Sequence, residues 1–475
     1  MDVMRERPRG AEFARVWAEE RKLLLLLLIA FVGYFLYFGG STTIGSDTAD
    51  YQAAARVLTD GWHQILDRVP GYPLLLVATG AQEGPSRSLF VVQLSAYLVG
   101  VFLSVRIARR LGATSRWTTA LAIVLLLPPV VGPVVAIGTE GPAEFLLVVA
   151  AWLFVRWFDD QRARWLIGLG LTVGASAWVR PTFTLWFIPV AGLVAMASTA
   201  PTLPRRAAAG AAAAAPALGV VALLVVINAV RFGYPTTTPL LGWNLSTRTV
   251  AYVEEAPLSE EPLRSTLIEA RDQSLVSGES HSGLMYIWSV RPTLQANPGQ
   301  SAQDLDRRML RLNLRLIAHN PLDYLSAVAT ASGTYVLLAG ADDDRLNSAA
   351  ARAVWAPMHL LLGAVFLAQW CVMSGLAVLR RLQRRTVLAL GFLYLTMFYN
   401  AAVSTLIEVG NPRYRIPTDA LAMIAVAVGL TAWGQARSSP IAGSGVQEDA
   451  STPGRAPSGV DMPLTAPVPS YGHGL

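Results

Sequence analysis

The stretch GSDTADYQAAARVLTDGWHQILDRVPGYP, residues 45–73, decides how the rest of the chain is interpreted. It follows the first hydrophobic run and is too polar to cross a bilayer. Residues 49–60 have the apolar spacing of a helix. One side of that helix would carry Tyr51, Ala54, Ala55 and Leu58. The segment Arg68–Pro73 then ends the helical pattern, because proline disfavours helical geometry in the preceding residue and lacks a backbone donor.

Two of the carboxylates and one of the arginines in this stretch are candidates for a functional site. Asp47 and Asp50 stand at its start, immediately outside the first hydrophobic run, and Arg68 stands near its end. We therefore expect a short structured loop at the membrane surface that holds charges of both signs. A reaction on a charged lipid head group would need a site of this kind.

The composition is that of a polytopic membrane protein. Of the 475 residues, 53% are hydrophobic and only 15% are charged, and the mean hydropathy is +0.43. These values argue against a large soluble enzyme. The formal net charge of +6 at pH 7 mainly reports topology in a membrane protein, so we expect no nucleic-acid partner. The single cysteine, Cys371, excludes a disulfide framework and a thiolate metal site.

A membrane-spanning helix needs roughly 20 mostly apolar residues. The sequence predicts about ten spans, at residues 23–39, 88–108, 117–137, 142–158, 164–179, 183–199, 207–230, 353–379, 386–407 and 416–434. With ten spans, the four arginine clusters at residues 106–116, 156–164, 205–206 and 380–385 all lie on the side of the N-terminus. Because cytoplasmic loops are rich in Lys and Arg, this pattern predicts cytoplasmic termini in the plasma membrane. The first run could be a signal peptide, but no A-x-A-like site is obvious, so we interpret it as a retained helix.

Five regions are expected along the chain. They are a cytoplasmic arm at 1–22, a transmembrane module at 23–230 with its first external loop at 40–87, an external segment at 231–352, C-terminal transmembrane helices at 353–434 and a disordered cytoplasmic tail at 435–475. Gly71–Gln82 is apolar but short, which predicts a juxtamembrane or re-entrant piece. Ser326–Gly340 is expected to be an interfacial helix, because a span there would move a later arginine cluster outside.

With this topology, an unusual set of polar residues gathers at the outer ends of helices. They are Asp47, Asp50, Arg68, Glu140, Arg180, Asn228, Glu408, Asn411, Arg413, Tyr414 and Arg415. Each has a structural alternative, such as capping a helix for Asp47 or anchoring at the interface for Arg180. External arginines at 413 and 415 run against the positive-inside tendency, which favours a function. Glu144 follows Glu140 by one helical turn, where a carboxylate usually lines a cavity or pairs with a partner.

Taken together, these stretches resemble the GT-C superfamily of integral membrane glycosyltransferases, and most of all the branch of protein O-mannosyltransferases and the bacterial lipid A aminoarabinose transferase. The matching pieces are Asp47–Tyr51, Arg68–Pro73, Thr139-Glu140, Val179–Pro181, Asn228 with Gly233, Gly242–Leu245, Asn320-Pro321 and Arg413–Pro417. They run in family order up to about residue 434. No single motif is specific. The resemblance implies an all-α GT-C fold with juxtamembrane helices in the first external loop.

The resemblance also implies a reaction. Such an enzyme moves a sugar, with inversion, from a polyprenyl-phosphate donor to a hydroxyl of a cell-envelope lipid, glycan or protein on the outer face. Asp47 matches the acidic residue used at the acceptor, usually as general base, and Glu140 matches the second acidic position. Asp50 is a third candidate for catalysis, although many relatives carry adjacent acids where Thr48 follows Asp47. The candidates for binding the donor phosphate are Arg68, Arg180, Arg413, Arg415 and Tyr414, because guanidinium groups match phosphate oxygens.

Metal dependence varies within this superfamily. Since the five histidines are scattered, we expect no essential cofactor or metal, although a divalent metal stays possible. Two other hypotheses are a lipid-linked sugar flippase or transporter, and a scaffold subunit with a decayed site. Glu144 inside a span and the break at Pro128-Pro129 would suit the transporter, but no internal repeat supports it. Retention of Asp47 argues against decay.

Overall fold

The computed structural model describes residues 9–277, 286–296, 301–336, 349–378, 382–408 and 410–438. Within these ranges every regular element is a helix, and the only extended pairing is an isolated bridge between Thr43 and Ala136. The prediction of an all-α chain is therefore confirmed. Residues 1–8 of the predicted arm lie outside the described residues, as does the predicted tail beyond Ser438. The first four residues of that tail instead continue the last helix.

Several helices have the length and composition of membrane spans. The long helices are α1 (Arg9–Tyr37), α4 (Arg87–Arg110), α7 (Glu140–Asp160), α10 (Leu203–Phe232), α16 (Ala349–Val378), α17 (Arg384–Leu406) and α18 (Asp419–Ser438). Among the described residues, α4, α7, α10, α17 and the stretch Arg413–Gln435 are long and apolar enough to cross a bilayer. The prediction of a multi-pass membrane protein is confirmed, whereas the count of ten spans stays a prediction.

The predicted span at 117–137 is broken in the middle. It consists of α5 (Ser115–Leu125) and α6 (Pro128–Val135), which are bent by 52° relative to each other. Leu127 has extended backbone angles, as a residue before proline prefers. Two consecutive prolines therefore end one helix and start the next.

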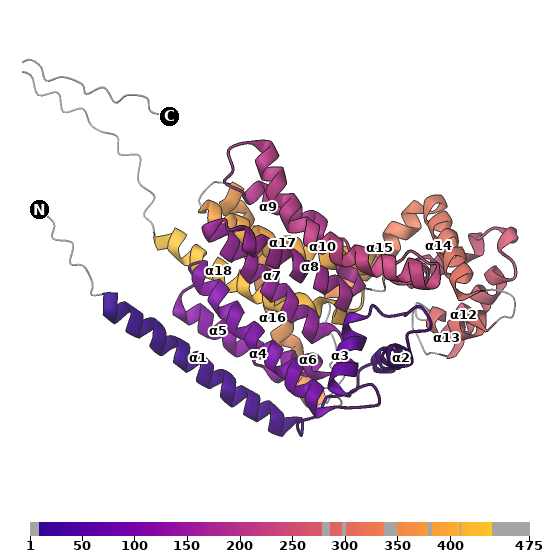
Figure 1. The fold of residues 1–475 in the computed structure, drawn as a ribbon, viewed down its shortest axis with the longest axis horizontal. Helices are drawn as coiled ribbons and strands as arrows, with labels where there is room; N and C mark the ends of the chain where they lie inside the picture. The colour runs from indigo at the N-terminus through magenta and orange to yellow at the C-terminus, as the bar shows by residue number, and fades with distance from the viewer. Residues whose placement is uncertain are drawn as a thin grey trace, which may run out of the picture. The chain divides into compact units, whose positions relative to one another are not determined.

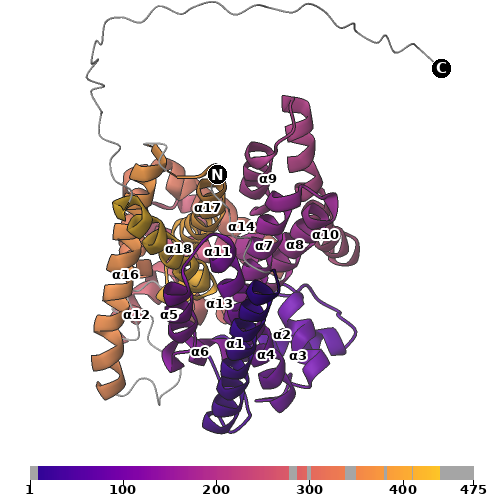
Figure 2. The ribbon, with the colours of Figure 1, turned by 90° about the vertical axis from the view of Figure 1, so that its left-hand side faces the viewer.

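The predicted spans at 164–179 and 183–199 correspond to shorter apolar helices. These are α8 (Ala163–Val179) and α9 (Phe187–Ala197), which follow each other through the 3-10 turn η1 (Pro181–Phe183). Figure 2 shows α8, α9 and α10 side by side. A Cβ atom at Gly170 of α8 would lie 2.3 Å from the Ala213 carbonyl oxygen of α10, so this glycine permits the close approach of the two backbones.

The loop at residues 40–87, which is predicted to be external, contains two short helices, α2 (Thr48–Thr59) and α3 (Gly71–Thr79), as the sequence predicts. Gly80 ends α3 with a φ of 65°, a conformation that glycine adopts without strain. The two helices share a small core with the start of α4 and the residue Ile137. Its buried members are Tyr51, Ala55, Tyr72, Leu76, Ala81, Leu89 and Ile137. This core fixes the loop against the segment that leads into α7.

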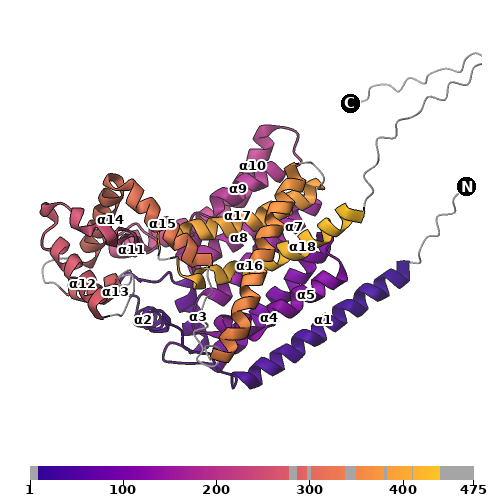
Figure 3. The same cartoon turned by 180° about the vertical axis from the view of Figure 1, so that it is seen from behind.

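The described residues of the predicted external segment (residues 231–352) form helices with a core of their own. They are α11 (Leu241–Thr249), α12 (Leu263–Ser277), α13 (Tyr286–Gln295), α14 (Ala302–His319) and α15 (Pro321–Val336), with the 3-10 turns η2 (Val250–Glu255) and η3 (Leu258–Glu260). In α14 the buried residues Leu305, Met309, Leu312 and Leu316 follow a helical period. Helices α12, α13 and α14 lie together near α2 (Figure 1), and α15 leads from α14 back to α17 (Figure 3).

Candidate active site

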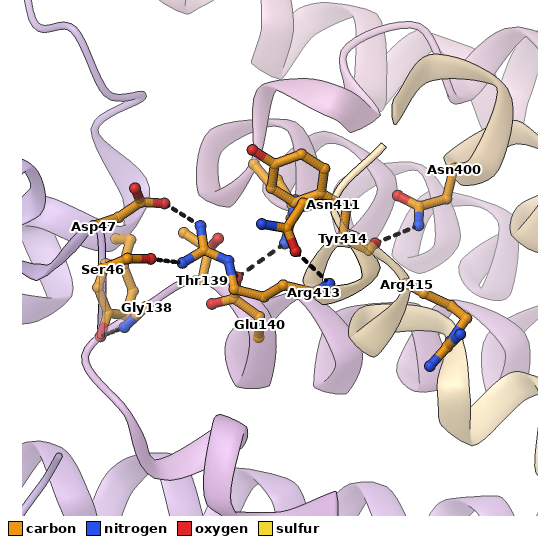
Figure 4. A network of polar contacts seen from close by, with 12 residues as sticks. Ser46, Asp47, Gly138, Thr139, Glu140, Asn400, Asn411, Arg413, Tyr414 and Arg415 are labelled. Carbon is orange, nitrogen blue, oxygen red and sulfur yellow. Dashed lines mark hydrogen bonds and ion pairs between the residues drawn. The ribbon is translucent and has the colours of Figure 1, made fainter. Parts of the chain in front are cut away.

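One arginine joins two acidic side chains from distant parts of the chain. Arg413 lies on the 3-10 segment η4 (Pro412–Thr418), between α17 and α18. Its Nη2 donates to Asp47, which precedes α2, and its Nε lies 3.2 Å from Glu140 Oε1 at the start of α7. Its Nη1 donates to the Ser46 hydroxyl. Figure 4 shows this guanidinium between the two carboxylates. The Asp47 side chain makes no cap to α2 and instead contacts arginine.

A second arginine approaches Glu140 from α8. Arg180 Nη1 lies 3.6 Å from Glu140 Oε1, and both side chains are only 7% exposed. The guanidinium of Arg180 also stacks 5.0 Å from the ring centre of Tyr414, a favourable cation–π distance. Arg180 is extended because Pro181 follows it, and this ends α8 at the site. A buried carboxylate needs such cationic partners, since an unpaired buried charge is strongly destabilising.

A third arginine links the remaining acidic candidate. Arg68 Nη2 lies 3.3 Å from Asp47 Oδ1 and 2.6 Å from Asp50 Oδ2. The same guanidinium lies 5.1 Å from the ring centre of Tyr51. The Asp50 side chain is 62% exposed and that of Asp47 is 27% exposed. Asp47 is therefore the more sheltered carboxylate, and it sits between two guanidinium groups.

The charges around Asp47 determine its protonation state. Burial alone would raise the pKa of the Asp47 carboxyl, but the guanidinium groups of Arg68 and Arg413 lower it below its ordinary value. The carboxylate is therefore ionised at neutral pH. At Glu408 the effect of burial is larger than that of the charged partners. Burial raises the pKa of the Glu408 carboxyl, although Arg180 and the Tyr414 hydroxyl favour its charged form. Glu408 thus belongs to the same charged cluster.

The backbone that presents Glu140 is held by side chains that the sequence did not single out. The Tyr72 hydroxyl accepts from the Gly138 amide at 2.8 Å and donates to Gln93 at 2.8 Å. Thr48 donates to the carbonyl oxygen of Ile137 at 3.1 Å. All these groups are buried. Nothing in their spacing along the chain identifies them, because their contacts join segments that are far apart in sequence.

The segment η4 is positioned by two asparagines. The Asn411 side chain accepts from the Arg413 amide at 2.9 Å, and Asn400 of α17 donates to the Tyr414 carbonyl at 2.7 Å. Arg415 is directed away from Asp47 (Figure 4). Its Nε lies 3.2 Å from Asp419 Oδ1, and its Nη1 donates to the Val336 carbonyl at 3.0 Å.

The structure thus brings together most of the sequence-predicted site residues. The clustered ones are Asp47, Asp50, Arg68, Glu140, Arg180, Arg413 and Tyr414. Arg415 does not join them. Asn228, another residue of the predicted outer set, donates instead to the carbonyl of Thr236 in the loop after α10, at 2.6 Å.

The cluster opens onto a narrow pocket. Its wall includes Asp47, Gly138, Glu140, Arg413 and Ile416. Among the described residues, no group of three His, Cys, Asp or Glu side chains could hold a metal ion. Asp47, Asp50 and Glu140 each contact at least one guanidinium group. Chemically, the pocket offers an ionised carboxylate, Asp47, that can accept a proton and one guanidinium, Arg413, that can bind a phosphate.

Comparison with known proteins gives two similar solved structures. The archaeal oligosaccharyltransferase AglB from Archaeoglobus fulgidus, in complex with an inhibitory peptide and a dolichol-phosphate, aligns with a TM-score of 0.46 at 12% identity over 87% of this chain. ArnT from Cupriavidus metallidurans, bound to undecaprenyl phosphate, aligns with a TM-score of 0.34 at 13% identity over 87% of this chain and 78% of its own. The chain spans about half the length (50%) of AglB. No family model matches the chain, and no curated protein does.

Proposed function

We propose that this protein is a GT-C-type membrane glycosyltransferase that moves a sugar from a polyprenyl-phosphate donor to a hydroxyl acceptor on the outer face of the membrane. The observation that carries the proposal is the position of Arg413 between Asp47 and Glu140. Asp47, Glu140 and Arg413 line one pocket, which supports a role for Asp47 as proton acceptor and for Arg413 in binding phosphate. The resemblance of the sequence to the GT-C superfamily supports the same chemistry.

In the proposed reaction, Asp47 is the general base. The acceptor hydroxyl oxygen attacks the anomeric carbon of the donor sugar, while Asp47 takes the hydroxyl proton. The bond between the anomeric carbon and the phosphate oxygen breaks, and the polyprenyl phosphate leaves with the electron pair. Negative charge develops on this phosphate, and fixed guanidinium groups stabilise such charge in the transition state. Arg413 and Arg180 would serve as these groups.

Donor binding would also prepare the base. In the free site the guanidinium of Arg413 contacts both Asp47 and Glu140. A donor phosphate competes with these carboxylates for the same N–H donors. As the guanidinium turns toward the phosphate, the pKa of Asp47 rises toward its ordinary value, and the carboxylate becomes a better base. Glu140 would keep Arg180 in place during this exchange.

The alternative function is a flippase or transporter for lipid-linked sugars. The observation in its favour is Glu144, a carboxylate inside α7 that is only 2% exposed and lines a small pocket together with Tyr97, Leu125 and Ala420. Buried ionisable residues in membrane helices commonly mark transport pathways. The transferase does not need Glu144.

One experiment separates the two functions. Proteoliposomes that contain the protein are given radiolabelled polyprenyl-phosphate mannose, glucose and arabinose, together with an extract of envelope acceptors. The transferase releases free polyprenyl phosphate and moves label to an acceptor. If no donor is consumed while labelled lipid crosses the bilayer, the flippase hypothesis replaces this proposal.

A further inference from the structure

A second cavity lies beside the charged cluster, between the first external loop and the external segment. It has a volume of about 130 Å³. Asp50, Gln64 and Arg68 of the first loop line one wall, and Trp288 and Arg291 of α13 line the other. A cavity this small is below the roughly 300 Å³ of pockets that take drug-sized ligands. It has room for a small group of about one ring.

The chemistry of the lining suits a neutral, hydroxyl-rich ring. Carboxylate, amide and guanidinium groups offer both acceptors and donors for hydroxyls. Trp288 and apolar residues such as Val57 and Leu240 offer surfaces for the C–H faces of the ring. A lipid chain is excluded by the number of polar groups. The lining has no net charge to attract an anion, because Asp50 and Asp67 are paired with Arg68 and Arg291.

The walls of the cavity are held in place before any ligand binds. Arg291 Nη2 lies 2.5 Å from Asp67 Oδ1, and the Arg291 guanidinium stacks 5.1 Å from the ring centre of Trp243 in the external core. The Thr238 hydroxyl donates to the Asp67 carbonyl at 2.8 Å. These contacts tie the external segment to the first loop, so a ligand need not order the site.

The cavity is connected to the proposed base by a single side chain. Arg68 lines the cavity, and its Nη2 lies 3.3 Å from Asp47 Oδ1. Asp47 itself is outside the lining. A ring held here therefore cannot carry the reacting hydroxyl, but it can belong to the unit next to the one that does.

We infer that this cavity is an acceptor subsite for one sugar ring, and that the acceptor is a glycan of at least two rings whose terminal ring reaches Asp47. The inference rests on the proposed function, because only a transferase has an acceptor. It goes further than that function because it names a glycan, and not a protein or a simple lipid, as the acceptor. Trp288 is the residue that sets this preference, by stacking on the ring.

The test is a binding measurement that needs no donor. Saturation-transfer NMR is recorded on the full chain in nanodiscs with mannose, glucose, arabinose, a disaccharide of each, and a peptide that contains Ser and Thr. We expect signals from at least one disaccharide in the wild type. Trp288→Ala should weaken that binding about five- to tenfold, the loss of one aromatic contact. Trp288→Phe keeps an aromatic ring and should retain most of the disaccharide binding.

A matched control is Trp433→Ala, which removes an indole from α18, outside the cavity. It should bind like the wild type. The inference is overturned if no saccharide binds, if Trp288→Ala binds disaccharides as well as the control does, or if only the peptide binds. Because no donor is present, these outcomes are independent of the transfer assay. Failure of transfer with intact disaccharide binding would instead contradict the proposed reaction.

Discussion

Arg413 Nε lies 3.2 Å from Glu140 Oε1, and this contact joins the segment before the last helix to the first turn of α7. The same guanidinium donates to Asp47 through another nitrogen. Only the planar fork of an arginine can reach both carboxylates in this way. The site therefore forms only when the segment before α18, the first turn of α7 and Asp47 are held next to one another.

Arg413→Lys should abolish this bridge while it keeps the positive charge. An ammonium is a point charge and cannot match two carboxylates, or the oxygens of a phosphate, in a planar arrangement. We expect kcat/KM for donor consumption to fall about 100-fold, typical of losing one fixed donor at a developing charge. Arg311→Lys changes an exposed arginine of α14 and serves as the control. Equal rates for the two variants would contradict the role of Arg413.

Gly138→Ala should displace Glu140 without unfolding the protein. A Cβ atom at Gly138 would lie 2.5 Å from Glu140 Oε2, and the carboxylate end of a flexible side chain can move away. We expect a loss in kcat/KM of about 10- to 100-fold, since small misplacements of site groups cost this much. The thermal unfolding temperature should stay close to that of Gly192→Ala, where an added Cβ meets no atom within 4 Å. Full activity in Gly138→Ala would show that the position of Glu140 does not matter.

Tyr72→Phe should reduce both stability and activity. The variant loses a buried hydroxyl that accepts from the Gly138 amide and donates to Gln93. A buried donor without a partner costs about 1–3 kcal/mol, and the turn before Glu140 is loosened. The measurement is the thermal unfolding temperature together with the transfer rate. An unchanged unfolding temperature would mean that these hydrogen bonds contribute little.

Asp306 should make the stability of the external segment depend on pH. Burial raises the pKa of Asp306 to about 6, although the Trp243 indole and Arg291 favour its charged form. In the unfolded chain an aspartate titrates near pH 3.9. Between about pH 4 and 6 the folded state holds a proton that the unfolded state has released, so the free energy of unfolding decreases as pH rises. Over this pH range the free energy of unfolding decreases by at most about 3 kcal/mol.

Asp306→Asn tests this dependence. The amide oxygen can still accept from the Trp243 indole, which donates to Asp306 Oδ1 in the wild type. The variant should therefore unfold at a higher temperature than the wild type at pH 7.5, and at a similar temperature near pH 4. A variant that is less stable than the wild type at pH 7.5 would contradict the raised pKa.

The sequence predicted those parts of the fold and site that depend on local pattern. The helix over residues 49–60 followed from apolar spacing, and α2 buries Tyr51, Ala54 and Ala55 as expected. The candidate residues followed from charges at the ends of apolar runs, because ionisable side chains in such positions are costly and usually functional. Seven of the eight predicted site residues lie in one cluster.

The features that the sequence did not predict are contacts between distant segments. The break at Pro128-Pro129 within the predicted span at 117–137 is confirmed, but the 52° angle between α5 and α6 could not be predicted. The core of the external segment was not predicted. Arg415 was grouped with Arg413 because both flank Tyr414. In the 3-10 turn of η4 the two side chains diverge, and Arg415 contacts Asp419 instead.

The most direct test of the account is the transfer rate of Asp47→Asn in membranes supplied with radiolabelled polyprenyl-phosphate sugars. Asparagine keeps the size of the side chain and an oxygen for the arginines, but it cannot accept the proton. The account predicts that the labelled donor still binds to the variant. The transfer rate should fall by about 10²- to 10⁴-fold, the range for a general base. Transfer at the wild-type rate in Asp47→Asn would contradict the account, because the base would then lie elsewhere.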